Sequence, residues 1–133
     1  MLQPEGKILV IDDERDMVAI LKKYLTDAGY QVSLPGNVME SAAEAARILP
    51  DLILMDVKMP FKDGYQIKAE LNQNEKTADI PVIFLSSSVS DLDRKKGAAL
   101  KADCYVTKPF DIKDLLAKVS AALKRSGPVA EST

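Results

Sequence analysis

The sequence places side chains that could do phosphoryl chemistry at the ends of short apolar runs. Asp12 and Asp13 follow the first run, Asp56 follows the third, and Ser86 and Lys108 follow later ones. Taken singly, an aspartate in such a position is more often a turn or helix-cap residue than a ligand. Together, three carboxylates repel one another strongly in a partly desolvated site, so the set is costly without a compensating cation.

The types of these side chains indicate which cation and which reaction would suit them. Oxygen ligands without cysteine or histidine favour Mg²⁺ or Mn²⁺ over zinc. A carboxylate can attack phosphorus and form an aspartyl phosphate. A metal, a lysine and a hydroxyl can balance the charge on the transferring oxygens. We therefore expect a phosphoacceptor site in which Asp56 is the nucleophile and Lys108 and Ser86 assist it.

Those residues meet only if the apolar runs form one sheet. Continuous apolar runs over residues 8–11, 52–55 and 82–85 predict strands buried on both faces. Shorter, mixed runs at 30–34 and 104–106 are candidates for two further strands. Helical spacing follows each run, and the two weaker helices are expected over residues 64–73 and 91–100. The sequence thus predicts an α/β fold, a doubly wound five-stranded parallel sheet with five helices. Ligands bind at the carboxyl ends of the strands in such sheets, where the candidate residues lie.

The first predicted helix has the clearest apolar stripe. Ile20, Tyr24 and Leu25 recur in it at helical spacing, and Gly29 is placed to end the helix. The spacing predicts an amphipathic helix.

Composition and charge argue against several other classes of protein. A chain of 133 residues is one domain by length, and its net charge of −2 gives no basic patch for nucleic acid. The single cysteine, Cys104, cannot form an internal disulfide. Histidine is absent, so any phosphohistidine in the pathway must lie on another protein. Neither a signal pattern nor a long apolar run is present, so we expect a cytoplasmic protein without membrane insertion.

Four segments resemble the receiver domain of bacterial two-component response regulators. They are VIDDE at 10–14, LILMDVKMPFKDG at 52–64, PVIFLSS at 81–87 and ADCYVTKPF at 102–110. The resemblance covers residues 6–124 and implies a flavodoxin-like (βα)5 fold. It also implies a phosphorelay role, in which the domain accepts a phosphoryl group from a partner phosphohistidine in a Mg²⁺-dependent reaction and signals by conformational change.

The resemblance also implies a role for each matching residue. Asp56 is the expected phosphoacceptor. Asp13, Asp56 and the backbone carbonyl of Lys58 are the expected metal ligands, and Asp12 is expected to support the metal through water.

Three further roles follow from the same resemblance. Lys108 is expected to pair with the phosphate and to precede a cis peptide bond to Pro109. Ser86 is expected to follow the phosphoryl group, and Tyr105 to swing inward when Ser86 moves.

Two other functions are weighed against the receiver. A phosphatase of the haloacid dehalogenase type also uses an aspartate nucleophile, but it needs a second aspartate two residues later, where this chain has Lys58. An inactive interaction module is disfavoured because the acidic pair, Asp56, Ser86 and Lys108 are all present. We therefore expect no enzyme activity beyond the domain's own aspartyl phosphorylation and dephosphorylation.

The expected receiver domain spans residues 6–125, followed by a flexible tail or linker over 126–133. This organisation fits a stand-alone regulator, and equally fits the receiver of a longer regulator or hybrid kinase. The expected partners are a histidine kinase or histidine phosphotransfer protein, and a downstream protein that contacts the fourth helix, fifth strand and fifth helix.

Overall fold

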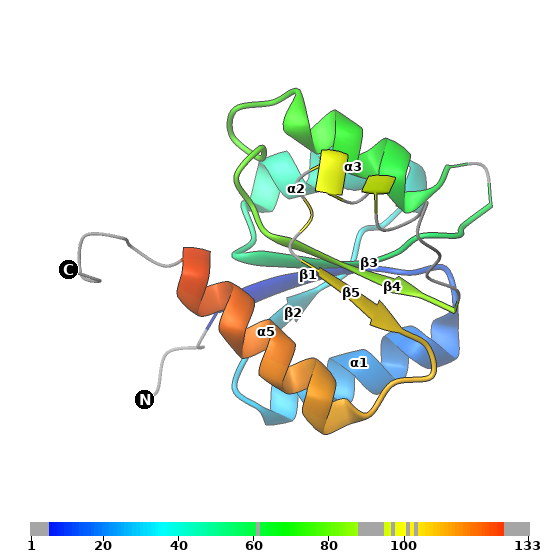
Figure 1. The fold of residues 1–133 in the computed structure, drawn as a ribbon, viewed down its shortest axis with the longest axis vertical. Coiled ribbons are helices and arrows are strands. Elements are labelled where there is room, and N and C mark those ends of the chain that lie inside the picture. Colours follow the sequence, from blue (N-terminus) through cyan, green and yellow to red (C-terminus); the bar gives the residue numbers. More distant parts are fainter. Residues whose placement is uncertain are drawn as a thin grey trace.

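The computed structural model describes residues 6–60, 62–87, 95–96, 98–100, 102 and 104–126. In this part of the chain five strands form one parallel sheet, with the bounds β1 (Lys7–Ile11), β2 (Gln31–Ser33), β3 (Leu52–Asp56), β4 (Val82–Ser86) and β5 (Cys104–Thr107). Their order is β2-β1-β3-β4-β5 (Figure 1). The chain runs outward from β1 to β2 and resumes on the other side of β1. The strand order therefore reverses between β1 and β3, which confirms the doubly wound sheet.

Helices cover both faces of this sheet (Figure 1). Those with complete bounds are α1 (Arg15–Asp27), α2 (Ser41–Ile48), α3 (Gly64–Asn72) and α5 (Ile112–Ser126). α1 and α5 lie on one face, and α2 and α3 lie on the other. Alternate residues of β1 consequently enter different cores: Ile8 and Val10 join the α1 and α5 side, whereas Leu9 and Ile11 join the α2 and α3 side.

The continuous apolar runs follow from this two-sided cover. Every residue of β3 and of β4 is buried, so neither strand has a solvent face that would favour alternating polar positions. The polar exceptions, Asp56 and Ser86, are the last residues of the two strands. The sheet therefore delivers both at the edge where ligands are expected.

The buried face of α1 is narrower than its apolar stripe. Leu21 and Leu25 are completely buried, but Ile20 and Tyr24 retain 44% and 39% of their exposure. These two residues share the helical spacing of the stripe but do not lie on the buried face of the helix. They lie at the margin of the stripe, and the sheet face that α1 covers reaches only its centre.

The predicted fourth helix can be compared with the structure only in part. Lys95, Lys96, Ala98 and Ala99 are helical, while residues 91–94 and 97 lie outside the described residues. Among the described helices, none is both long enough and apolar enough to cross a membrane.

Candidate functional site

The carboxylates meet where β1 and β3 end. These strands are neighbours, with Ile11 opposite Met55, so the residues that follow, Asp12 and Asp56, lie side by side. One carboxylate oxygen from each of Asp12, Asp13 and Asp56 lies within 4.8 Å of the others. The fold thus brings together the three carboxylates singled out in the sequence.

Asp12 is already engaged within the protein. Its Oδ1 accepts a hydrogen bond from the backbone N–H of Glu14 at 2.9 Å, and its Oδ2 accepts one from the Lys108 ammonium at 3.0 Å. Its side chain is fully buried, whereas Asp13 is exposed. Asp13 and Asp56 therefore have more capacity for direct contact with a metal than Asp12 has.

Lys108 is the residue that follows β5, and its side chain reaches the acidic cluster. Its ammonium lies 3.0 Å from Oε1 of Glu14 and 3.6 Å from Oδ1 of Asp56. Burial by itself lowers the pKa of Lys108, but the hydrogen bonds to Asp12 and Glu14 outweigh burial, and the pKa is raised above its ordinary value. Lys108 is therefore a cation at neutral pH. The peptide bond from Lys108 to Pro109 is cis, as the resemblance implies.

Asp56 lies in surroundings that oppose its negative charge. Burial, and after it the charge of Asp12, raises the pKa of Asp56 to about 6, although Lys108 acts in the opposite direction. Lys108 thus compensates only part of the charge of the cluster. A cluster of carboxylates in this condition favours a bound cation, and an all-oxygen donor set fits a hard divalent ion such as Mg²⁺.

Gly64 fixes the path of the chain from Asp56 into α3. Its N–H donates a hydrogen bond to the carbonyl of Val57 at 2.8 Å. A Cβ on Gly64 would lie 2.6 Å from the backbone carbonyl oxygen of Asp56, an atom that belongs to the strand and cannot move aside. Glycine is therefore required here because the loop returns directly over the end of β3.

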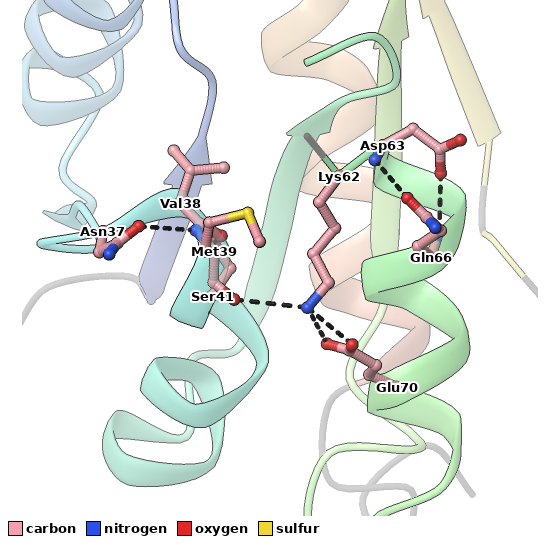
Figure 2. A network of polar contacts seen from close by, with 8 residues as sticks. All are labelled: Asn37, Val38, Met39, Ser41, Lys62, Asp63, Gln66 and Glu70. Carbon is pink, nitrogen blue, oxygen red and sulfur yellow. Dashed lines mark hydrogen bonds and ion pairs between the residues drawn. The ribbon is translucent and has the colours of Figure 1, made fainter. Parts of the chain in front are cut away.

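Lys62 joins this loop to α3 and to the segment that precedes α2 (Figure 2). Its ammonium lies 2.6 Å from Oε2 of Glu70 on α3, and 3.3 Å from the backbone carbonyl oxygen of Met39, just before α2. Next to it, Asp63 and Gln66 form a reciprocal capping box at the start of α3. The Asp-x-x-Gln spacing could have revealed this cap, but no sequence signal singles out Lys62.

Ser86 and Tyr105 lie on neighbouring strands. Ser86 is 3% exposed and lies opposite Thr107, while Tyr105 lies opposite Phe84. The ring of Tyr105 packs against Phe84, with the ring centroids 5.4 Å apart, and its hydroxyl is hydrogen-bonded to the hydroxyl of Tyr65 at 2.8 Å. No pattern in the sequence singles out Tyr65. The inward movement expected of Tyr105 stays a prediction.

The parallel sheet and the cluster at its carboxyl edge define an α/β domain of the receiver type. The chain belongs to the response regulator receiver domain family, which matches residues 8–120. It is therefore a receiver domain of the two-component systems, with a signalling role as a phosphoryl acceptor.

Two relatives and one solved structure illustrate the similarity. The transcriptional regulatory protein CpxR of Klebsiella pneumoniae is 41% identical over 121 residues, which cover 91% of this chain and 50% of that protein. The DNA-binding dual master transcriptional regulator RpaA of Synechocystis is 36% identical over 126 residues, which cover 95% of this chain and 52% of that protein. The chain thus spans about half the length of these relatives.

The solved structure is the receiver domain of the sensor histidine kinase PA1611 from Pseudomonas aeruginosa PAO1, with a magnesium ion coordinated in its active-site cleft. It superposes with a TM-score of 0.81 at 26% identity, and the match covers 90% of this chain and 98% of that one.

Proposed function

We propose that Asp56 is the phosphoacceptor of this receiver domain, and that the donor is a phosphohistidine of a histidine kinase or histidine phosphotransfer protein. The observation that carries the proposal is the position of Asp56, a buried carboxylate at a strand end, 3.6 Å from the Lys108 ammonium and grouped with Asp12 and Asp13. A lysine and a cation site beside one carboxylate suit phosphoryl transfer. These 133 residues contain no histidine, so the phosphohistidine lies outside them.

Mg²⁺ is the cofactor that best fits the donor set, and Mn²⁺ has the same ligand preferences. Asp13, Asp56 and the backbone carbonyl of Lys58 would hold the ion, and Asp12 would act on it through water. When bound, the ion would supply positive charge to the phosphoryl oxygens. The magnesium ion in the PA1611 receiver domain supports this choice.

The reaction uses the residues of the chain in separate roles. A carboxylate oxygen of Asp56 attacks phosphorus as the phosphorus–nitrogen bond to the donor imidazole breaks, and the imidazole leaves with that electron pair. Lys108, held in place by Asp12 and Glu14, lies beside the phosphoryl oxygens. The Ser86 hydroxyl then donates a hydrogen bond to the aspartyl phosphate. The domain acts on its own aspartate only.

Phosphoryl uptake from a small phosphodonor, followed by mass spectrometry of the intact protein, tests this proposal. One phosphoryl group should be added with Mg²⁺ and none with EDTA, and Lys108→Met should slow uptake about 100-fold or more because it removes a charge at the reacting oxygens. Lys118→Met is the matched control, because it breaks an exposed ion pair with Asp114 on α5. Uptake that needs neither Mg²⁺ nor Lys108 would show the proposal to be wrong.

We propose that the signal leaves through the fourth helix, β5 and α5 to a downstream protein. A groove of about 650 Å³ lies on these elements, and its lining includes Ala98, Tyr105, Phe110 and Lys118. Because Tyr105 lines the groove, any movement of its ring changes the shape of this surface.

The organisation of the whole protein is also a proposal. We place the receiver domain at residues 6–125. Its last helix, α5, ends one residue beyond this boundary, at Ser126. The relatives are about twice as long and are named transcriptional or DNA-binding regulators, which supports a second candidate, the receiver of a longer regulator. In either case we propose a cytoplasmic domain that does not itself contact nucleic acid.

A further inference from the structure

Three aromatic rings form one cluster between α3 and the end of the sheet. Phe84 of β4 is completely buried, and its ring centroid lies 5.1 Å from that of Tyr65 and 5.4 Å from that of Tyr105. Tyr65 meets Phe84 edge to face, and Tyr105 meets it at a tilt of 33°. The Tyr105 hydroxyl donates a hydrogen bond of 2.8 Å to the Tyr65 hydroxyl.

This hydrogen bond joins two positions of different function. Tyr65 follows Gly64, which packs directly on the backbone carbonyl of Asp56, so Tyr65 is fixed relative to the phosphoacceptor strand. Tyr105 lies on β5 and lines the proposed output groove. The bond therefore runs from the active-site side of α3 to the output side of the sheet.

The region between β4 and β5 contributes a further contact. The ammonium of Lys96, an exposed residue, lies 5.5 Å from the centroid of the Tyr65 ring. A cation at this distance from an aromatic face is attracted by it. Tyr65 thus contacts Phe84 of β4, Tyr105 of β5 and Lys96 of the helical segment between them.

We propose that Tyr65 is a positioning residue for the switch, which holds the Tyr105 ring against Phe84 through the paired hydroxyls. We call Tyr65 and Tyr105 the tyrosine latch. The protein loses stability when a partly buried hydroxyl gives up a hydrogen bond. The hydrogen bond between the two hydroxyls therefore favours the position in which the Tyr105 ring packs on Phe84 over one in which the ring points away. The consequence for signalling depends on the proposed function, but the latch itself does not.

The latch is testable by NMR of protein with labelled tyrosine rings. Tyr65→Phe removes one hydroxyl and keeps the ring, so the ratio of packed to outward Tyr105 should fall about 2- to 10-fold, the range expected for one hydrogen bond. The matched control is Tyr24→Phe on α1, because Tyr24 also has a lysine over its ring, Lys23 at 5.3 Å, and does not belong to the cluster. The control should leave Tyr105 unchanged.

Two further measurements make the outcome decisive. In the wild-type protein, the Tyr105 hydroxyl proton should exchange with water several-fold more slowly than that of exposed Tyr24, and this comparison needs no variant. Adding Mg²⁺ and beryllofluoride, a phosphoryl mimic, should change the ratio of packed to outward Tyr105, and the size of this change should differ between Tyr65→Phe and wild type. Equal Tyr105 populations in the two proteins, or equal exchange of the two hydroxyls, would overturn the latch.

These experiments can refute the latch and the phosphoacceptor assignment independently of each other. The Tyr105 populations without Mg²⁺ report on the latch alone. Phosphoryl uptake from a small phosphodonor reports on the phosphoacceptor site and not on the latch, so Tyr65→Phe should take up the group as wild type does. If the wild-type protein took up no phosphoryl group, the phosphoacceptor assignment would be refuted and the latch would be unaffected.

Discussion

Asp56 is buried at the end of β3, where its charge meets that of Asp12 and is only partly balanced by Lys108. The pKa of Asp56 is raised from 3.8 to about 6, mainly by burial. At neutral pH the carboxylate is ionised at a cost in stability, and this cost is what a bound cation can offset. The same unfavourable charge therefore connects folding stability with affinity for metal.

This coupling predicts that Asp56→Asn stabilises the protein in EDTA at pH 7. Because the folded pKa lies above the unfolded one, the folded state binds more protons between pH 3.8 and about 6, and stability falls as pH rises through this window. The gain should be about 1 to 3 kcal/mol at pH 7, and should shrink towards zero below pH 4, where wild-type Asp56 is protonated. Urea unfolding at both pH values measures it.

Asp79→Asn serves as the control for that experiment. Asp79 is exposed, so its replacement should change stability by less than about 0.5 kcal/mol at either pH. A destabilised Asp56→Asn at pH 7 would mean that Lys108 compensates the charge of Asp56 in full.

At the scale of elements, the loop from β3 to α3 is held by two contacts near its α3 end. Gly64 presses it against the end of β3, and Lys62 joins it to Glu70 and to the carbonyl of Met39. The loop contains Lys58, whose carbonyl is a proposed metal ligand. A change at Lys62 should therefore reach the metal site without touching a proposed ligand.

We expect Lys62→Met to weaken Mg²⁺ binding about 2- to 5-fold, the range expected for a partly exposed ion pair. The aliphatic stem remains, so the loop loses the charge contact but little packing. Titration with Mg²⁺ measures the effect. Lys118→Met on α5 breaks an ion pair of similar type far along the chain and should bind as wild type does. Unchanged binding by Lys62→Met would mean that Gly64 alone orders the loop.

For the whole molecule, the sheet and the grouping of the candidate site residues at its edge could be predicted because their signals are local. A strand buried on both faces must be apolar throughout, so its end is marked by the first polar residue, as at Asp56 and Ser86. Tyr65 and Lys62 could not be found in this way, because what they contact depends on how α2, α3 and β5 pack. The exposure of Ile20 likewise depends on how far the sheet extends under α1.

The most direct test of the phosphoacceptor maps the modified residue. The protein is incubated with Mg²⁺ and a small phosphodonor and then reduced with borohydride, which converts an aspartyl phosphate to homoserine, before peptide mass spectrometry. Homoserine should be found at position 56 in wild type, and Asp56→Asn should contain none at any position. Full labelling of Asp56→Asn, or homoserine at Asp12 or Asp13 in wild type, would contradict the assignment of Asp56.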